Sequence, residues 1–173
     1  GGVTYGWVDV VASSGLLNQG TFSMKFPGYT ADDRDRMTLT VTGGALTNAG
    51  TLTLETTNSY RGPLYVYANV TNDPGGVLNA IGHGAVTLGN TAATHLNRGT
   101  WTITEATGMT VKGDGTSFTQ DAAGAALTAS MFLFDNDSIY SYQSASATAV
   151  NNFSVTAGSV AGHFTFKKTA VTL

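Results

Sequence analysis

Two acidic side chains close together in the sequence are the pair best suited to glycoside chemistry. On a strand, Asp135 and Asp137 would share one face and Asn136 would point the other way, because side chains alternate between faces. Glycoside hydrolysis requires two carboxyl groups that flank the scissile bond. The sequence Asp-Asn-Asp-Ser directly after the apolar run 131–134 is also typical of a turn. We favour the turn, so the sequence predicts no catalytic residue.

Residues that could bind a metal are scattered or already neutralised. The segment 31–36 reads Ala-Asp-Asp-Arg-Asp-Arg, in which arginines alternate with carboxylates that could otherwise bind Ca²⁺. A zinc site needs at least three converging ligands, and the spacing of the three histidines indicates no convergence: His83, His95 and His163. The sequence contains no cysteine, which excludes disulfides and thiolate ligands. We therefore expect no metal and no cofactor.

Tyrosines in two alternating pairs are the strongest candidates for a binding surface. Tyr65 and Tyr67 would fall on one face of a strand, and Tyr140 and Tyr142 on one face of another. Aromatic side chains can stack on sugar rings and often act as contact points in interfaces. Alternating tyrosines are also good strand residues that pack across a sheet, so both interpretations stay open.

The elements that would position these residues belong to a chain with few charges. Residues 1–173 fit a single domain, and charged residues make up only 11% of them, against about a quarter in an average soluble domain. The polar surface must therefore consist largely of Thr, Ser and Asn, which is typical of secreted β proteins and of fibre or particle subunits. We expect an extracellular, cell-surface or virion location.

Charge and hydropathy also exclude two classes of partner. The formal net charge is −3, and eight lysines and arginines cannot form the dense basic surface that nucleic-acid binding needs. No apolar run is long enough to cross a membrane as a helix. We therefore expect neither nucleic-acid binding nor membrane insertion.

A turn followed by an alternating strand recurs along the chain. The pattern Asn-x-Gly-Thr begins at Asn18, Asn48 and Asn97, and each copy precedes a run of alternating apolar and polar residues. Asn and Gly predict turns in which the backbone adopts positive φ. Residues 121–130, which contain Gly124, are predicted to form a loop or a single turn. Strands are predicted at residues 3–11, 20–26, 37–42, 51–54, 63–70, 85–88, 101–104, 110–112, 131–134, 139–143, 153–156 and 163–166.

Two all-β architectures fit these strands. A right-handed parallel β-helix is favoured, because asparagines at repeated turns can form a ladder between coils. An antiparallel β-sandwich or barrel is a close alternative. The distance from Asn18 to Asn48 is 30 residues and from Asn48 to Asn97 is 49, which is uneven for regular coils. The first 45 and the last 45 residues are also more typical of hairpins.

Residues 46–104 resemble the autotransporter-associated β-strand repeat. That repeat has Gly-Thr-Leu-Thr-Leu, which matches residues 50–54, followed by Asn-x-Tyr-x-Gly, which matches residues 58–62, and then a strand. Residues 80–88 are similar to the Leu-Gly-x-Gly-Ala-Val-Thr-Leu segment of the same proteins. The resemblance implies a parallel β-helix in a large secreted or surface-displayed bacterial protein, and it implies no activity.

We expect the chain to be a non-enzymatic structural or adhesive β module of a bacterial cell surface or extracellular fibre. Its partners would be copies of itself, joined through a strand in residues 163–173, and glycans. The first alternative is a virion structural protein, a capsid-decorating or tail subunit with a sandwich or barrel fold. The second is a polysaccharide-active β-helix enzyme. Gly82-His83-Gly84 is similar to a motif of pectin-degrading hydrolases, but the preceding aspartates and the following Arg-x-Lys are missing.

Overall fold

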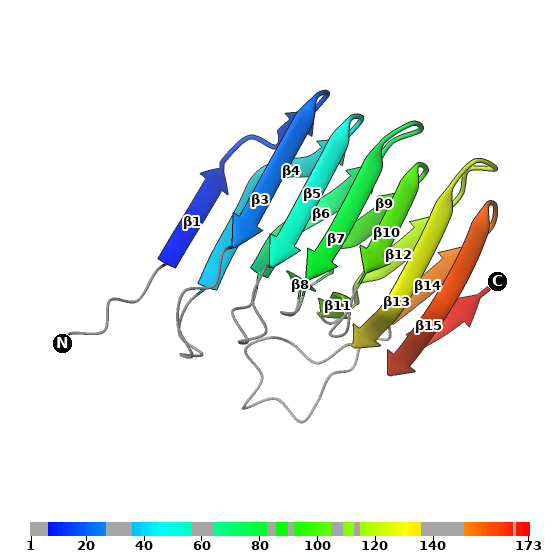
Figure 1. Ribbon diagram of the computed structural model, residues 1–173. Coiled ribbons are helices and arrows are strands. Elements are labelled where there is room, and N and C mark those ends of the chain that lie inside the picture. Colours follow the sequence, from blue (N-terminus) through cyan, green and yellow to red (C-terminus); the bar gives the residue numbers. More distant parts are fainter. Residues whose placement is uncertain are drawn as a thin grey trace.

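Every regular element of the described chain is a β-strand. The computed structural model describes residues 7–26, 36–56, 64–82, 86–89, 92–104, 109–112, 115–135, 151–167 and 169–173. These residues form sixteen strands and no helix. All strand pairs are parallel, and the coils stack into a β-solenoid (Figure 1). The prediction of a parallel β-helix is confirmed, and the antiparallel sandwich or barrel is excluded.

Each coil contributes strand segments to three rows. The first row contains β1 (Trp7–Ala12), the first halves of β4 (Arg36–Asn48) and β6 (Leu64–Asn72), β8 (Val86–Gly89), β11 (Met109–Lys112), and the second halves of β13 (Ala126–Asp135) and β15 (Ser159–Lys167). The second row contains β2 (Leu16–Asn18), the second halves of β4 and β6, β9 (Thr94–Asn97), β12 (Ser117–Gln120), β14 (Asn151–Val155) and β16 (Thr169–Thr172). The third row contains β3 (Thr21–Phe26), β5 (Thr51–Thr56), β7 (Val77–Gly82), β10 (Thr100–Thr104), and the first halves of β13 and β15.

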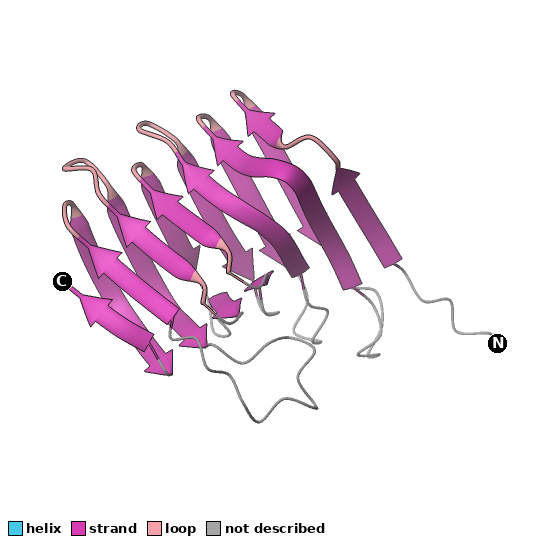
Figure 2. Ribbon diagram, turned by 180° about the vertical axis from the view of Figure 1, so that it is seen from behind, coloured by secondary structure: helices cyan, strands magenta, loops and turns pink. Residues whose placement is uncertain are grey.

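The path of the chain around the stack is right-handed. In Figure 1 the second-row strands run upward at the back, the chain crosses at tight turns, and the third-row strands run downward at the front as the coils advance toward the C-terminal end. Figure 2 shows these turns, in pink, gathered along one edge of the stack. The side chains that flank the turns are therefore brought into line from coil to coil.

The core is built from alternating side chains that point into the solenoid. In β6, Leu64, Val66 and Val70 are buried, whereas Tyr65 and Tyr67 between them are only half-buried. Because the coils pair in register, inward-facing residues of successive coils form columns. Aromatic rings fill the column near the C-terminal end, where the rings of Phe118 and Phe153 lie 5.3 Å apart.

The glycines of the Asn-x-Gly-Thr turns do not adopt positive φ, which corrects the sequence prediction, and at Gly50 and Gly99 they serve close packing instead. Gly20, Gly50 and Gly99 are not among the positive-φ residues of the described chain. A Cβ atom on Gly20, in the first turn, would meet nothing within 4 Å. A Cβ atom on Gly50 would lie 2.1 Å from the carbonyl oxygen of Gly20, closer than any real contact. The turns approach this closely because backbone hydrogen bonds join them, such as the 2.8 Å bond from Thr51 N–H to the Gly20 carbonyl.

Three further expectations need correction. The hairpins expected near both ends are wrong, because β1 pairs with β4, and β14 with β16, in parallel. The uneven spacing between Asn48 and Asn97 arises because Asn72 occupies the same position in the coil between them. Residues 121–125 form a turn, but the predicted loop ends there because Ala126 already begins β13. The strand predicted at 139–143 lies outside the described residues.

Candidate functional site

A ladder of buried side-chain amides runs along the tight turns. Asn18 Nδ2 donates to Asn48 Oδ1 at 2.7 Å, and Asn48 Nδ2 donates to Asn72 Oδ1 at 2.8 Å. The ladder continues with Asn72 Nδ2, which donates to Asn97 Oδ1 at 3.0 Å, and with Asn97 Nδ2, which donates to Gln120 Oε1 at 2.9 Å. All five residues are buried, and buried amides without partners would be costly. The ladder satisfies them by joining each coil to the next.

Each ladder amide also uses its second N–H, which fixes the turn of the following coil. Asn48 Nδ2 donates to the carbonyl of Val77 at 3.0 Å, and Val77 is the first residue of the strand after the next turn. At the last member, Gln120 Nε2 donates to the carbonyl of Ser159 at 2.9 Å. The residue paired with Gln120 in the next coil is Val155, which has no side-chain amide to accept or donate a further bond. The ladder therefore ends at Gln120.

An ion pair joins the outer sides of two neighbouring turns. Arg98 Nε donates to Asp121 Oδ1 at 2.9 Å, next to the ladder step from Asn97 to Gln120. The hydrogen bond from Arg98 lowers the pKa of Asp121 below its ordinary value. The side chains of Arg98 and Asp121 are 42% and 33% exposed. Ion pairs exposed to this degree stabilise a fold only weakly, because water screens them. The pair therefore aligns the two turns without forming an enclosed site.

His95 and Trp101 are buried polar groups that the ladder does not reach. His95 Nδ1 and Nε2 and Trp101 Nε1 have no hydrogen-bond partner among the described residues. Both side chains are 0% exposed, on β9 and β10, which flank the turn at Asn97. Burial lowers the pKa of His95 to about 4, so the imidazole is neutral at pH 7. His95 is therefore part of the core and has no access to a substrate.

Tyr65 and Tyr67 lie next to each other on the outer face of β6. Their ring centroids are 5.9 Å apart, and the rings are within 6° of parallel. Both are half-buried, and the residues paired with Tyr65 on the neighbouring coils are the threonines Thr38 and Thr87. Aromatic faces are suited to contacts with sugars, but both threonines are buried. The binding role predicted for this pair stays a prediction.

The other residues singled out from the sequence do not assemble into a described site. Tyr140, Tyr142, His83, Asp137 and the segment 31–35 lie outside the described residues. Asp135 is the last residue of β13. Within the described ranges, no group of three or more His, Asp or Glu residues could hold a metal ion.

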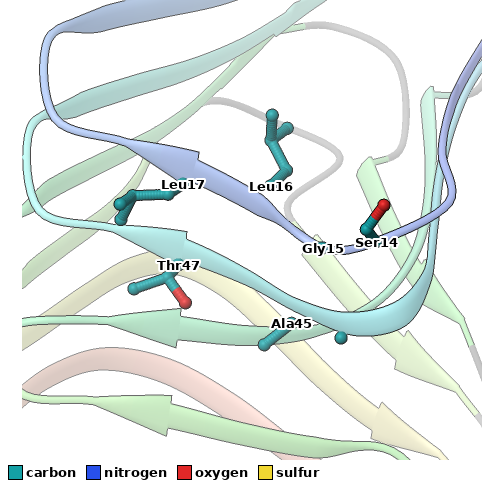
Figure 3. Close-up of a pocket in the computed structure, with 7 residues that line it drawn as sticks. Ser14, Gly15, Leu16, Leu17, Ala45 and Thr47 are labelled. Carbon is teal, nitrogen blue, oxygen red and sulfur yellow. The ribbon is translucent and has the colours of Figure 1, made fainter.

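A shallow depression of about 320 Å³ lies between β2 and β4 (Figure 3). Figure 3 shows the side chains of Leu16 and Leu17 on opposite sides of the β2 ribbon, with Ala45 and Thr47 on the neighbouring strand. No acidic, basic or histidine side chain lines the depression. Its exposed lining is more polar than apolar, and it offers no general acid or base.

Two members of the ladder were missed by the sequence analysis. Asn72 is followed by four turn residues before its strand begins at Val77, whereas Asn48 is followed by two. The longer turn includes Gly75 at φ 82°. Gln120 carries the same amide on a longer side chain. A search for any amide residue before a turn of variable length would have found both.

Comparisons with known proteins place the chain in no family. No protein-family model, curated protein or solved structure gave a match. No helix long and apolar enough to cross a membrane occurs among the described residues. The similarity of residues 46–104 to the autotransporter-associated repeat therefore stays a prediction.

Proposed function

We propose that the chain is a non-enzymatic structural or adhesive module of a bacterial cell surface or extracellular fibre, and that it self-associates by strand addition. The observation that carries this proposal is the amide ladder from Asn18 to Gln120. Its buried polar groups bond coil to coil, so the architecture is organised around stacking. At both ends of the stack, strand edges are left unpaired within the described residues, and such edges template further pairing.

The stacked Tyr65 and Tyr67 rings support an adhesive variant of this role, with a glycan as the partner. The virion alternative depended on a sandwich or barrel fold, which the parallel pairing excludes, so we do not retain it. The enzyme alternative depends on Asp135 and Asp137, and no described geometry supports it.

The proposal is tested by the mass of the purified chain in solution together with negative-stain electron microscopy. We expect filaments or ordered oligomers whose mass rises with protein concentration. Deletion of residues 167–173 removes β16 and should abolish assembly. Circular dichroism of the truncated chain checks that its sheet persists. A monomer at every concentration, or full assembly by the folded truncated chain, would contradict strand addition through this segment.

A further inference from the structure

The exposed large apolar side chains of the described residues are gathered at the two ends of the stack. The least exposed, Val10, still has an exposed fraction of 38%, and the most exposed, Leu173, one of 86%. In Figure 1, β1 lies at one end and β15 at the other. The apolar groups are Val8, Val10, Val11 and Leu17 at the N-terminal end and Val171 and Leu173 at the C-terminal end.

Some of these side chains occupy positions that are buried in every neighbouring coil. Val10 pairs in register with Leu39, which is 0% exposed. Val171 pairs in register with Phe153, which is 1% exposed. Residues paired on parallel strands point to the same face of the sheet, so Val10 and Val171 face the core. They are exposed because no described coil covers them.

We propose that two copies of this chain join head to tail, with the first coil of one copy stacked on the last coil of the next. The inference rests on the proposed self-association and specifies its partner and geometry. A second copy suits these ends because β1 and β2 at one end, and the second half of β15 and β16 at the other, are edges of the same two strand rows, the first and the second. Stacking them repeats the parallel junction that already joins every pair of coils within the chain.

The internal register, continued across such a junction, matches apolar positions in the first and second rows. The third row ends one coil earlier, at the first half of β15, so one strand position there stays empty between β15 and β3 of the next copy. The register is obtained by following the pairing from the first coil to the last. The matched inward-facing pairs are Val8 with Phe164 and Val10 with Phe166 in the first row, and Leu16 with Val171 in the second. An arbitrary extended peptide could pair with one row, but a second copy continues two rows at once.

The polarity of the contact decides the form of the assembly. A contact between two N-terminal ends is isologous and would stop at a dimer. A head-to-tail contact is heterologous and leaves one free end of each kind, so it continues into a filament unless its rotation closes a ring. The parallel direction of all described pairs favours the head-to-tail contact.

Disulfide cross-linking tests this polarity and register together. Asp9 and Thr165 are both exposed and would be directly opposite each other across the junction. Neighbouring strands lie about 4.8 Å apart, which is within the range that a disulfide spans. The chain has no cysteine of its own, so Asp9→Cys and Thr165→Cys each introduce a single thiol. Oxidation of a mixture of the two variants should give a disulfide-linked dimer of one molecule of each.

The matched control uses Thr104→Cys in place of Thr165→Cys. Thr104 is exposed like Thr165, but it lies on β10 inside the stack and away from the junction. We expect no cross-link between Thr104→Cys and Asp9→Cys. Dimers from Asp9→Cys alone or Thr165→Cys alone, equal cross-linking to the control, or assembly without any cross-link would overturn the head-to-tail geometry and leave self-association intact. A monomeric mass without any cross-link would contradict both proposals.

Discussion

At the scale of single residues, His95 is an anomaly in the core. The pairing of Leu96 with Thr71 places His95 next to Val70, and Phe118 pairs with it from the other side. Trp101 is buried on the strand after the turn. None of these neighbours is titratable or charged, so nothing described compensates a charge on the imidazole. The molecule therefore holds a group that it can accommodate only when neutral.

The burial of His95 predicts that acid destabilises the fold. Its pKa is lowered from 6.5 to about 4, so below pH 6.5 the unfolded chain binds a proton that the folded chain resists. The stability is complete above pH 6.5 and is lost as the pH falls toward 4, by about 3 kcal/mol in total. Urea unfolding between pH 7 and pH 4.5, followed by circular dichroism, measures this loss.

The variant His95→Leu is the control for that experiment, because leucine has a similar size and no polar atom. We expect it to be at least as stable as the parent chain at pH 7. Its stability should fall less steeply with pH, since only other groups, such as Asp121, still titrate. Parallel pH profiles for the two proteins would show that His95 does not cause the acid sensitivity.

At the scale of elements, the tight turns depend on one another through the amide ladder. Asn72→Ala would leave Asn48 Nδ2 with one acceptor fewer and Asn97 Oδ1 without its donor, both buried. Each unsatisfied buried group costs about 1–3 kcal/mol, so we expect a total loss of about 4 kcal/mol in the free energy of unfolding. Chemical denaturation at neutral pH measures it.

Asn69→Ala is the matched control on the same strand. Asn69 is exposed, and its Oδ1 accepts an exposed hydrogen bond from Thr94 N–H at 3.0 Å. Removal of this bond should cost less than about 1 kcal/mol. If the two variants lost equal stability, the ladder would be no more important than a surface hydrogen bond.

The sequence indicates these elements wherever their inward face is apolar. The run 37–42 and the run 64–70 alternate clearly, and both form strands. In β9 the pattern is reversed, because the buried residues are His95 and Asn97, whereas Leu96 between them is only half-buried. Hydropathy alternation therefore could not find β9. The prediction succeeds for local periodicity and fails where polar groups are buried by tertiary contacts.

Pairing between coils was harder to predict than the strands themselves. Asn18 and Asn48 are bonded across 30 residues, and nothing local distinguishes such parallel stacking from a hairpin. The regular turns at Asn18, Asn48 and Asn97 gave the correct architecture, while the longer turn after Asn72 concealed the true period. For the candidate site, the sequence placed Tyr65 and Tyr67 on one face, but it could not give the relative orientation of their rings.

At the scale of the whole molecule, stability should vary along the stack. A coil inside a solenoid contacts a neighbour on each side, whereas an end coil contacts only one. The ends also expose core positions such as Val10 and Val171. Local opening is therefore expected to begin at β1 and β16 and to reach β6 and β9 only when most of the stack has unfolded.

Hydrogen exchange of backbone amides, read by mass spectrometry, tests this gradient. In the dispersed chain, peptides from β1 and β16 should exchange fastest and peptides from β6 slowest. In an assembled sample, a head-to-tail junction pairs β1 of one copy with β15 of the next, and β2 with β16. Protection should then rise at both ends and stay unchanged in β6, because β6 already has neighbours on both sides. Equal protection along the whole chain in both samples would show instead that the stack opens as one cooperative unit and that assembly covers neither end.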